Sequence, residues 1–560
     1  MDNLEEILAK YVTDYYSYFI DYAVNEDKEV THLHFYDMEY GEFPLSEKII
    51  EFISEFKQLR SFYIETDKCI IKDLSPLKDL YELKSIFIEF DTEVENLDFA
   101  KDLKGLERLV IGSSKISNIE VLADKKWLNR INLPNAQISD ISVLSNLSEL
   151  INIDFSNNKI RNIDCLKDCN RLKDVFLSKN RIKDIKPLEN CKQLQHLGLN
   201  NNNISDIELL RDLEDLSHLS INDNQICDLS PIQHLKKIST LHIANNSISN
   251  IDFLKNFERL YDLNISNNEI VRLPSLMHTY LYKLDISKNS ISDISELKNK
   301  GSLRFLNISK NPIESIEPLR HLTKLEILLA SHLSRAKFNY YYFQSSLKIL
   351  DLSYCNISNI GYLFYYLNSL TDVNLSHNKI SSFYVSNVLP QLRYINLQYN
   401  KIEVIYSLQP FPKLETLDLR GNPLGNRYFQ EDIYLGRYSI FQTTKVANKD
   451  IYPLSELLLI MAERVSNRQN VTRQSTEEYS SKVSTNSQNN YQKRRQEEDL
   501  EGCTYAIIFL SMLSVYFGLV IQIIYKTDSY LIATLFTIIF LPLTIYAFAL
   551  LVEQMEKGKG

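Results

Sequence analysis

The sequence predicts an α/β solenoid, in which short coils stack into a curved arc with a parallel sheet on its inner face. Three observations lead to this fold class. An apolar phrase recurs about every 22 residues, an asparagine occupies one fixed position in most copies, and apolar residues are spaced by two before that asparagine and by three after it. We therefore expect short strands on the inner face and 3₁₀ or short-helical turns on the outer face.

The repeated phrase is clearest in the middle of the chain. One copy begins at Leu150 and reaches its asparagine at Asn158, with Ile153 and Phe155 as inward-facing strand residues. We expect the asparagine side chain to turn into the coil and to pair with backbone groups of the turn, because buried peptide groups need partners. In later copies the same position is occupied by Asn180, Asn202, Asn224, Asn246, Asn268, Asn289, Asn311, Leu333, Cys355, Asn378, Asn400 and Asn422.

These units resemble the short leucine-rich repeats of the internalin type, which are also found in cytosolic phosphatase-regulatory proteins. The segments NNNISDIELL (201–210) and ISKNPIESIEPL (308–319) carry the phrase closely. The resemblance implies a leucine-rich repeat arc that binds other molecules on a broad surface. It does not identify a partner, because members of this family bind unrelated partners.

Both ends of the repeat array need caps, because the first and last coils of a solenoid otherwise expose their core. An apolar stripe that begins at Leu4 predicts a helix through Ala23, and helical spacing after Pro453 predicts a second cap. The expected parts are a capping helix at 1–29, about 18 repeats at 30–424, a C-terminal cap at 425–465, a disordered polar linker at 466–501, a transmembrane hairpin at 502–552 and a cytoplasmic tail at 553–560.

Two apolar runs, 503–525 and 530–552, predict the hairpin, because crossing a bilayer takes about 20 apolar residues. Only residues 526–529 separate the runs, so both flanks should lie on one side of the membrane. The flanks are basic, with Lys493, Arg494 and Arg495 before the hairpin and Lys557 after it. The positive-inside rule then predicts an integral membrane protein with its repeats and both termini in the cytoplasm. Internalins differ, because they are exported.

Composition and motifs argue against catalysis. The net charge of −10 does not suit a nucleic-acid-binding surface, which is usually basic. The chain has no phosphate-binding glycine loop, no G-x-S-x-G elbow and no H-E-x-x-H helix. We therefore expect no enzyme activity, no cofactor, no metal and no small-molecule substrate. The seven cysteines form no C-x-x-C pair, and Cys169 and Cys191 are expected to be small core residues.

The predicted binding surface is an apolar patch on the inner face, where most other solvent-facing positions are polar. Its members are Phe305, Ile327, Leu329 and Ile349, with Tyr354 and Tyr394 nearby. Exposed apolar clusters with an aromatic rim often carry binding energy. The segment 334–343 is expected on the back of its coil; the alternatives are that it covers the patch or that the strand is distorted. His196, His218 and His242 are expected to form a polar contact surface rather than a metal site.

The leading hypothesis is a non-enzymatic, membrane-anchored interaction scaffold that captures a protein or peptide on its concave face. Two alternatives remain. The chain is a regulatory subunit of an enzyme such as a phosphatase, or, with its topology inverted, an exported adhesin.

Overall fold

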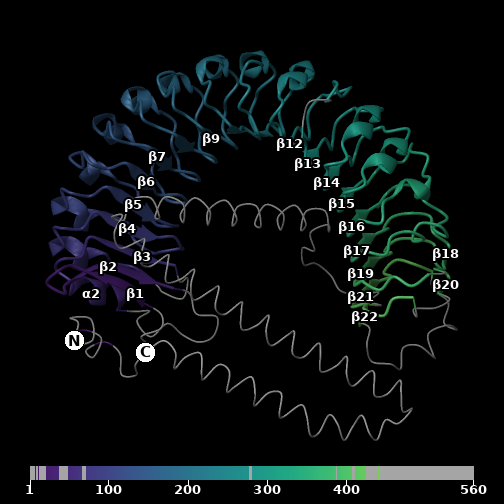
Figure 1. Cartoon of the computed structure of the whole chain (residues 1–560), viewed down its shortest axis with the longest axis horizontal. Helices are drawn as coiled ribbons and strands as arrows, with labels where there is room; N and C mark the ends of the chain where they lie inside the picture. The colour runs from purple at the N-terminus through teal and green to yellow at the C-terminus, as the bar shows by residue number, and fades with distance from the viewer. Residues whose placement is uncertain are drawn as a thin grey trace, which may run out of the picture. The chain divides into compact units, whose positions relative to one another are not determined.

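The computed structural model describes residues 20–36, 48–65, 71–276, 280–385, 387–405, 410–423 and 439–441, together with Ile7 and Tyr11. The chain divides into two units, Met1–Asp450 and Ile451–Gly560, and all described residues belong to the first. In this unit the strands lie along the inner side of the stacked coils and the 3₁₀ helices along the outer side (Figure 1). The expected solenoid with a parallel inner sheet is confirmed.

One 20-stranded sheet runs through the described residues, and almost every strand pairs in parallel with the strand of the next coil. The register is uniform. For example, His218, Leu219 and Ser220 lie opposite Thr240, Leu241 and His242. The strands are β1 (Ile20–Val24), β2 (Val30–Phe35), β3 (Ser61–Ile64), β4 (Ser85–Ile88), β5 (Arg108–Ile111), β6 (Arg130–Asn132), β7 (Asn152–Asp154), β8 (Asp174–Phe176), β9 (His196–Gly198), β10 (His218–Ser220), β11 (Thr240–His242), β12 (Asp262–Asn264), β13 (Lys283–Asp285), β14 (Phe305–Asn307), β15 (Ile327–Leu329), β16 (Ile349–Asp351), β17 (Asp372–Asn374), β19 (Tyr394–Asn396), β21 (Thr416–Asp418) and β22 (Ser439–Phe441).

The N-terminal cap differs from the expected helix. Residues Ile20–Val24 form strand β1, which pairs antiparallel with β2, so the predicted helix does not continue through Ala23. The reason is that β2 is the first parallel strand, and its free backbone groups need partners. The turn between the two strands contains Lys28 in a left-handed conformation, with φ of 63°. Most of residues 1–19 lie outside the described residues, and so do the predicted linker, hairpin and tail and, apart from residues 439–441, the predicted C-terminal cap at 425–465.

The outer side of most described coils turns through a 3₁₀ helix, and a short polar side chain often marks where it begins. The Asp140 carboxylate accepts the backbone N–H of Ser142 at 2.8 Å, and Asn162 does the same for Asp164 at 2.7 Å. The 3₁₀ helices are η2 (Ser75–Asp79), η3 (Asp98–Asp102), η4 (Glu120–Leu122), η5 (Ser142–Asn146), η6 (Asp164–Asp168), η7 (Lys186–Leu188), η8 (Glu208–Asp212), η9 (Ser230–Ile232), η10 (Asp252–Asn256), η11 (Ser295–Asn299), η12 (Glu317–His321) and η13 (Tyr340–Tyr342).

Two further elements lie outside this pattern. The α-helix α2 (Ile49–Ser54) precedes β3, and a two-stranded parallel sheet joins β18 (Ser382–Phe383) to β20 (Val404–Ile405). Within the described ranges, no helix combines the length and the apolar character that crossing a membrane requires.

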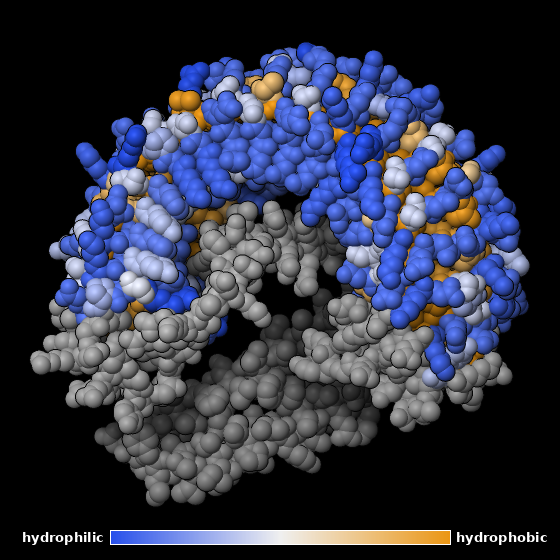
Figure 2. Space-filling model, turned by 180° about the vertical axis from the view of Figure 1, so that it is seen from behind, coloured by the Kyte–Doolittle hydropathy of each residue, from blue (hydrophilic) through white to orange (hydrophobic). Residues whose placement is uncertain are grey.

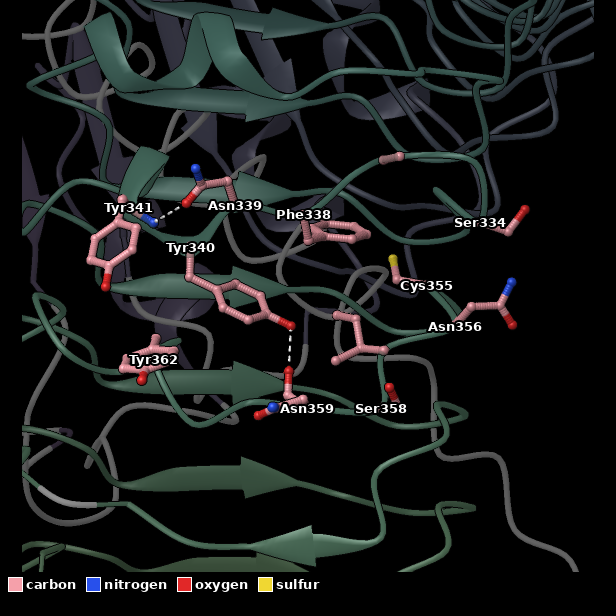
Figure 3. A pocket seen from close by; sticks show the side chains of 12 residues that line it. Ser334, Phe338, Asn339, Tyr340, Tyr341, Cys355, Asn356, Ser358, Asn359 and Tyr362 are labelled. Carbon is pink, nitrogen blue, oxygen red and sulfur yellow. Dashed lines mark hydrogen bonds between the residues drawn. The ribbon is translucent and has the colours of Figure 1, made fainter.

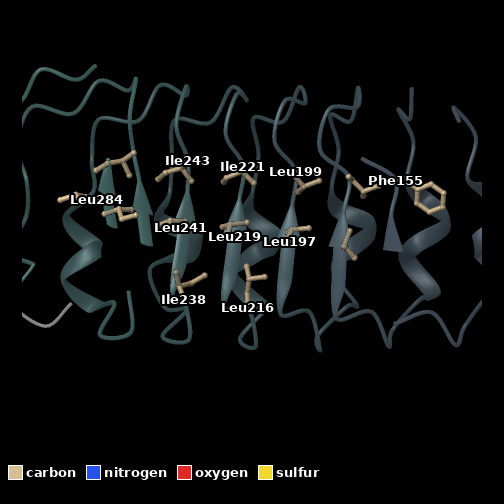
Figure 4. Packing of buried hydrophobic residues seen from close by; sticks show 14 of the residues in the cluster. Phe155, Leu197, Leu199, Leu216, Leu219, Ile221, Ile238, Leu241, Ile243 and Leu284 are labelled. Atoms are coloured by element: carbon tan, nitrogen blue, oxygen red, sulfur yellow. The ribbon is translucent and has the colours of Figure 1, made fainter. Parts of the chain in front are cut away.

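The core is a continuous apolar stack inside the coils. Leu197, Leu219 and Leu241 form one row of buried side chains, and Leu199 and Ile221 belong to the next row (Figure 4). Aligned coils place like residues against like residues, so each coil covers the core of its neighbour. The side of the array seen in Figure 2 is accordingly mostly hydrophilic in colour, with hydrophobic residues showing in smaller areas.

Cys169 and Cys191 are buried in this core and are free thiols, as predicted. Burial raises the pKa of the Cys169 thiol to about 11 and that of Cys191 to about 12. Both side chains therefore behave as small apolar residues.

The asparagines at the fixed repeat position, which we call the asparagine ladder, pair with backbone groups of the turns as expected. In Asn158, the amide NH₂ donates to the carbonyls of Leu133 at 2.9 Å and Phe155 at 3.0 Å, and its oxygen accepts the N–H of Ile138 at 2.9 Å. The residue before each ladder position has a left-handed backbone, as in Asn157 with φ of 56°. A single side chain therefore satisfies turn groups of two adjacent coils.

Candidate binding surface

The inner face of the sheet carries two rows of side chains. In each strand the central residue points into the core and its two neighbours point to the inner surface. In β14 the buried central residue is Leu306, the residue before it is Phe305 and the residue after it is Asn307. We call the positions before and after the central residue the first row and the second row. Parallel register makes Phe305, Ile327 and Ile349 consecutive members of the first row.

Five of the predicted binding residues lie in these rows. Phe305, Ile327, Ile349 and Tyr394 belong to the first row, and Leu329 belongs to the second. Their expected exposure is wrong for two of them. Phe305 is only 6% exposed and Leu329 is 0% exposed, whereas Ile327, Ile349 and Tyr394 are half-buried. The apolar surface that remains accessible is therefore smaller than the sequence suggested.

Close packing within the rows accompanies this burial. Leu329 lies between Asn307 and Asp351, which are themselves buried. The Asn307 amide donates to the Asp285 carboxylate one strand away, at 2.9 Å. Strands about 4.8 Å apart bring successive side chains of a row into contact, so that each one covers part of the next. In the first row, the Lys283 ammonium lies 5.7 Å from the centroid of the Phe305 ring.

Charged side chains border the half-buried pair Ile327 and Ile349. Glu326, which precedes Ile327, forms ion pairs with Arg304 and with Lys348, the latter at 2.7 Å. Hydrogen bonds from Lys348 and then Arg304 lower the pKa of the Glu326 carboxyl. Two cations share one carboxylate, so this border is polar and keeps one net positive charge.

Tyr354 lies beyond the strand end rather than in either row. Its ring stacks against His332, with centroids 4.3 Å apart, and against His377, with centroids 4.1 Å apart. Tyr399 continues the series at 4.5 Å from His377. We call these four side chains the ring stack; each has a left-handed backbone and immediately precedes its coil's ladder position. The sequence prediction named only Tyr354, although an aromatic or imidazole ring at this position in four successive coils could have revealed the stack.

The segment 334–343 contacts the outer parts of neighbouring coils. Lys337 forms a β-bridge with Ser315, and the Tyr340 hydroxyl donates to the backbone carbonyl of Asn359 at 2.6 Å. The rings of Tyr341 and Tyr362 lie 6.3 Å apart. These contacts agree with the expected location on the back of the coil and not with a cover over the inner face.

The three histidines of the inner face are close together, as predicted. His196 and His218 are neighbours in the first row, with ring centroids 4.5 Å apart, and His196 pairs with the Asp174 carboxylate. His242 lies in the second row and its Nε2 is 3.1 Å from the Asp262 carboxylate. Burial, with smaller effects from His196 and His242, lowers the pKa of His218 to about 4. Within the described part of the chain, no group of three or more such side chains is arranged to hold a metal ion.

Family models match several parts of the array. A model described as leucine-rich repeats in two copies matches residues 170–211 and 192–237, and two leucine-rich repeat models match residues 384–424 and 346–367. Residues 170–237 coincide with coils whose strands, 3₁₀ turns and asparagine ladder are described above, and the other two segments contain the strands β16, β19 and β21. The chain is a leucine-rich repeat protein. Leucine-rich repeat domains generally mediate protein–protein interaction.

Solved structures of other leucine-rich repeat proteins resemble this one. An internalin from Listeria monocytogenes is 23% identical over 58% of this chain and 83% of its own, with a TM-score of 0.40. A leucine-rich repeat protein from Leptospira interrogans is 20% identical over 70% of this chain and 92% of its own, with a TM-score of 0.44. The Arabidopsis receptor kinase HAESA, solved with a peptide hormone and a co-receptor, is 15% identical over 75% of this chain and 83% of its own, with a TM-score of 0.46. No curated protein matches the chain.

Proposed function

We propose that this leucine-rich repeat protein is a non-enzymatic, membrane-anchored scaffold that captures a protein or peptide on its concave face. The observation that supports this most is the pair Ile327 and Ile349, which lie side by side on adjacent strands and stay half-buried beside the charged residues Glu326 and Lys348. A partner that covers them gains apolar burial at the centre of the contact.

The surroundings of this pair favour a partner with an apolar anchor and a polar rim. The ion pairs of Arg304, Glu326 and Lys348 lie on one side of the pair. Along the first row, Tyr394 adds a half-buried ring two coils further on. Apolar centres with polar borders are typical of protein interfaces.

The anchoring part of the proposal rests on the sequence. The apolar runs 503–525 and 530–552 are joined to the repeats by the polar stretch 466–501. Basic flanks favour an orientation with the repeats in the cytoplasm. In this proposal the polar stretch connects the scaffold to the anchor, so that the partner is held near the membrane surface.

Substitution of the apolar pair tests the binding surface. The full chain is purified in detergent with its captured partner, and the double variant Ile327→Asn with Ile349→Asn is compared with wild type. Asparagine remains hydrated at a half-buried strand position in the free protein, but the partner would have to desolvate it, so we expect at least about a tenfold loss of affinity. The matched control is Thr240→Asn with Thr416→Asn, which lie at the same strand position in β11 and β21.

The Ile327→Asn, Ile349→Asn variant should unfold at a midpoint near that of wild type. If it still captures the partner as well as wild type does, the binding surface lies elsewhere. Co-purification of a stable stoichiometric enzyme would favour the regulatory-subunit alternative.

Two further measurements test the anchor and its orientation. A fragment of residues 1–501 should be released from membranes by a high-salt wash, whereas the full chain should remain. Protease added outside intact cells should leave the repeats uncut. Cleavage of the repeats under those conditions would favour the exported adhesin.

A further inference from the structure

A pocket opens on the outer side of the array, between the coils of β15 and β16 (Figure 3). Its volume is about 680 Å³. Phe338 and Tyr340 come from the segment that precedes and forms η13, and Tyr362 comes from the outer turn of the next coil. Tyr340 bridges the two coils through the 2.6 Å hydrogen bond from its hydroxyl to the Asn359 carbonyl. The pocket is thus built by two coils and is separate from the concave face.

None of the side chains that line the pocket is charged. The polar groups that it offers are amides and hydroxyls, and two of the amides have an unengaged donor side. The Asn339 side-chain oxygen accepts the N–H of Tyr341 at 3.2 Å, and the Asn359 side-chain oxygen accepts the N–H of Gly361 at 2.8 Å. Both amides therefore keep their NH₂ groups for a ligand. The hydroxyls of Tyr341 and Tyr362 make no hydrogen bond to another described residue.

A strip of exposed tyrosine rings continues from the pocket along the same outer surface. Tyr341 lies 6.3 Å from Tyr362 and 6.0 Å from Tyr366, and Tyr366 lies 4.8 Å from Tyr365 in an edge-to-face arrangement. These four side chains are between 47% and 63% exposed. They form an aromatic surface longer than the pocket itself, which suits an extended ligand.

Charged residues lie at the edge of the strip and not within it. Residues 352–371 contain no charged side chain, although charged residues make up 24% of the chain. The nearest charged groups in the segment before η13 are Arg335 and Lys337, which are exposed and form no ion pair with another described residue. The surface therefore has a neutral aromatic centre, and its edge carries the exposed Glu314 as well as these two cations, since the Lys337 N–H donates to the Glu314 carbonyl.

We infer that this pocket and tyrosine strip bind a proline-rich segment of another protein in the polyproline II conformation, with an acidic residue beside it. A polyproline II segment has unpaired backbone carbonyls and packs its rings into aromatic grooves at low entropic cost. Proline has no N–H, so such a segment brings acceptors that match the free amide and hydroxyl donors.

The occupant belongs to another chain. The 14 prolines of this protein include no two that are adjacent. An acidic residue next to the proline run would meet Arg335 and Lys337. This site is independent of the proposed concave surface, since the two lie on opposite sides of the coils of β15 and β16.

Fluorescence polarisation on the full chain in detergent tests this inference. The probe is a labelled decaproline peptide that ends in two aspartates, and the reference peptide replaces every proline with glycine. We expect saturable binding of the proline probe alone. The double variant Tyr341→Ser with Tyr362→Ser should weaken binding by at least about tenfold, because it removes the rings that the probe packs against. Arg335→Gln should weaken it less, because it removes only one charge that faces the aspartates of the probe.

The control is Tyr81→Ser, which removes a tyrosine of similar exposure, 62% against 63% for Tyr362, from a distant coil. Equal affinity for the proline and glycine peptides would overturn the inference, and so would unchanged binding by the double tyrosine variant. Saturable binding of maltoheptaose in place of the proline peptide would identify the pocket as a glycan site and also overturn it. The Ile327→Asn, Ile349→Asn variant should bind the proline probe as wild type does. The proposal for the concave face and the inference for this pocket can therefore be contradicted independently.

Discussion

The ring of Tyr354 lies almost parallel to that of His377, with 4.1 Å between the ring centroids and 9° between the planes. With His332 and Tyr399 on either side, this contact forms a stack of four rings across four coils. The stack ends at Gly421, where a Cβ atom would lie 2.6 Å from a ring carbon of Tyr399. The last ring therefore packs against a backbone that carries no side chain.

Gly421→Ala should destabilise the C-terminal coils by about 1–2 kcal/mol, since the backbone there is left-handed and the new methyl group would displace the Tyr399 ring. Gly421 has φ of +73°. The control is Gly105→Ala, because a Cβ at Gly105 meets nothing within 4 Å. Urea unfolding midpoints measure both variants. If the Gly421→Ala midpoint is as high as that of Gly105→Ala, the Tyr399 contact is not tight.

Asn224→Ala should destabilise the array by about 1–3 kcal/mol, because buried backbone groups lose their partner. The Asn224 amide donates to the carbonyl of Leu199 at 3.0 Å, and its oxygen accepts the N–H of Ile204 at 3.0 Å. The matched control is Asn203→Ala, an exposed site next to the preceding ladder asparagine. Asn201 is unsuitable as a control, since its φ of 54° would add backbone strain to an alanine. Equal thermal midpoints for Asn224→Ala and Asn203→Ala would contradict this role.

Leu329→Asp should destabilise the fold itself by several kcal/mol, because its side chain is 0% exposed and lies beside the buried Asp351. Leu329→Asn should cost less, since an amide can exchange hydrogen bonds with Asn307 and Asp351 without a second negative charge. Thermal unfolding at pH 7 compares the two variants. A Leu329→Asp protein as stable as wild type would show that this position is exposed in solution.

The folded protein should lose stability as the pH falls, and His218 should contribute to that loss. Burial lowers its pKa from the ordinary 6.5 to about 4. Below pH 6.5 the unfolded chain takes up a proton that the folded chain does not, so the contribution is complete above pH 6.5 and is lost as the pH falls toward 4. The full effect is on the order of 3 kcal/mol. Urea unfolding between pH 7 and 4 should therefore show a shallower pH dependence for His218→Gln than for wild type, whereas exposed His234→Gln should follow wild type.

The repeat pattern alone was sufficient for the solenoid, the inner parallel sheet and the asparagine ladder. In a solenoid each coil contacts only its neighbours, so a pattern repeated along the chain is also the pattern of its packing. The positions of Leu219 in the core and of Asn224 at the turn follow from this directly. The alignment of Phe305, Ile327 and Ile349 in one row follows in the same way.

Exposure could not be read from that pattern, because it depends on the side chains of adjacent coils. Leu329 occupies a surface row, yet it is buried between Asn307 and Asp351. The strand β1 forms because the edge of β2 needs hydrogen-bond partners, a requirement that the apolar stripe near the N-terminus does not reveal.

The burial of a charged residue could not be predicted from the repeat pattern either. Lys125 occupies a position with 0% exposure, and its ammonium reaches the Lys101 carbonyl at 2.8 Å and the Asp124 carboxylate at 2.6 Å. A lysine in the sequence predicts a solvated side chain. Its burial is possible only because the folded coils bring a carbonyl from 24 residues away to the ammonium group, a contact that exists in three dimensions and not in the repeat pattern.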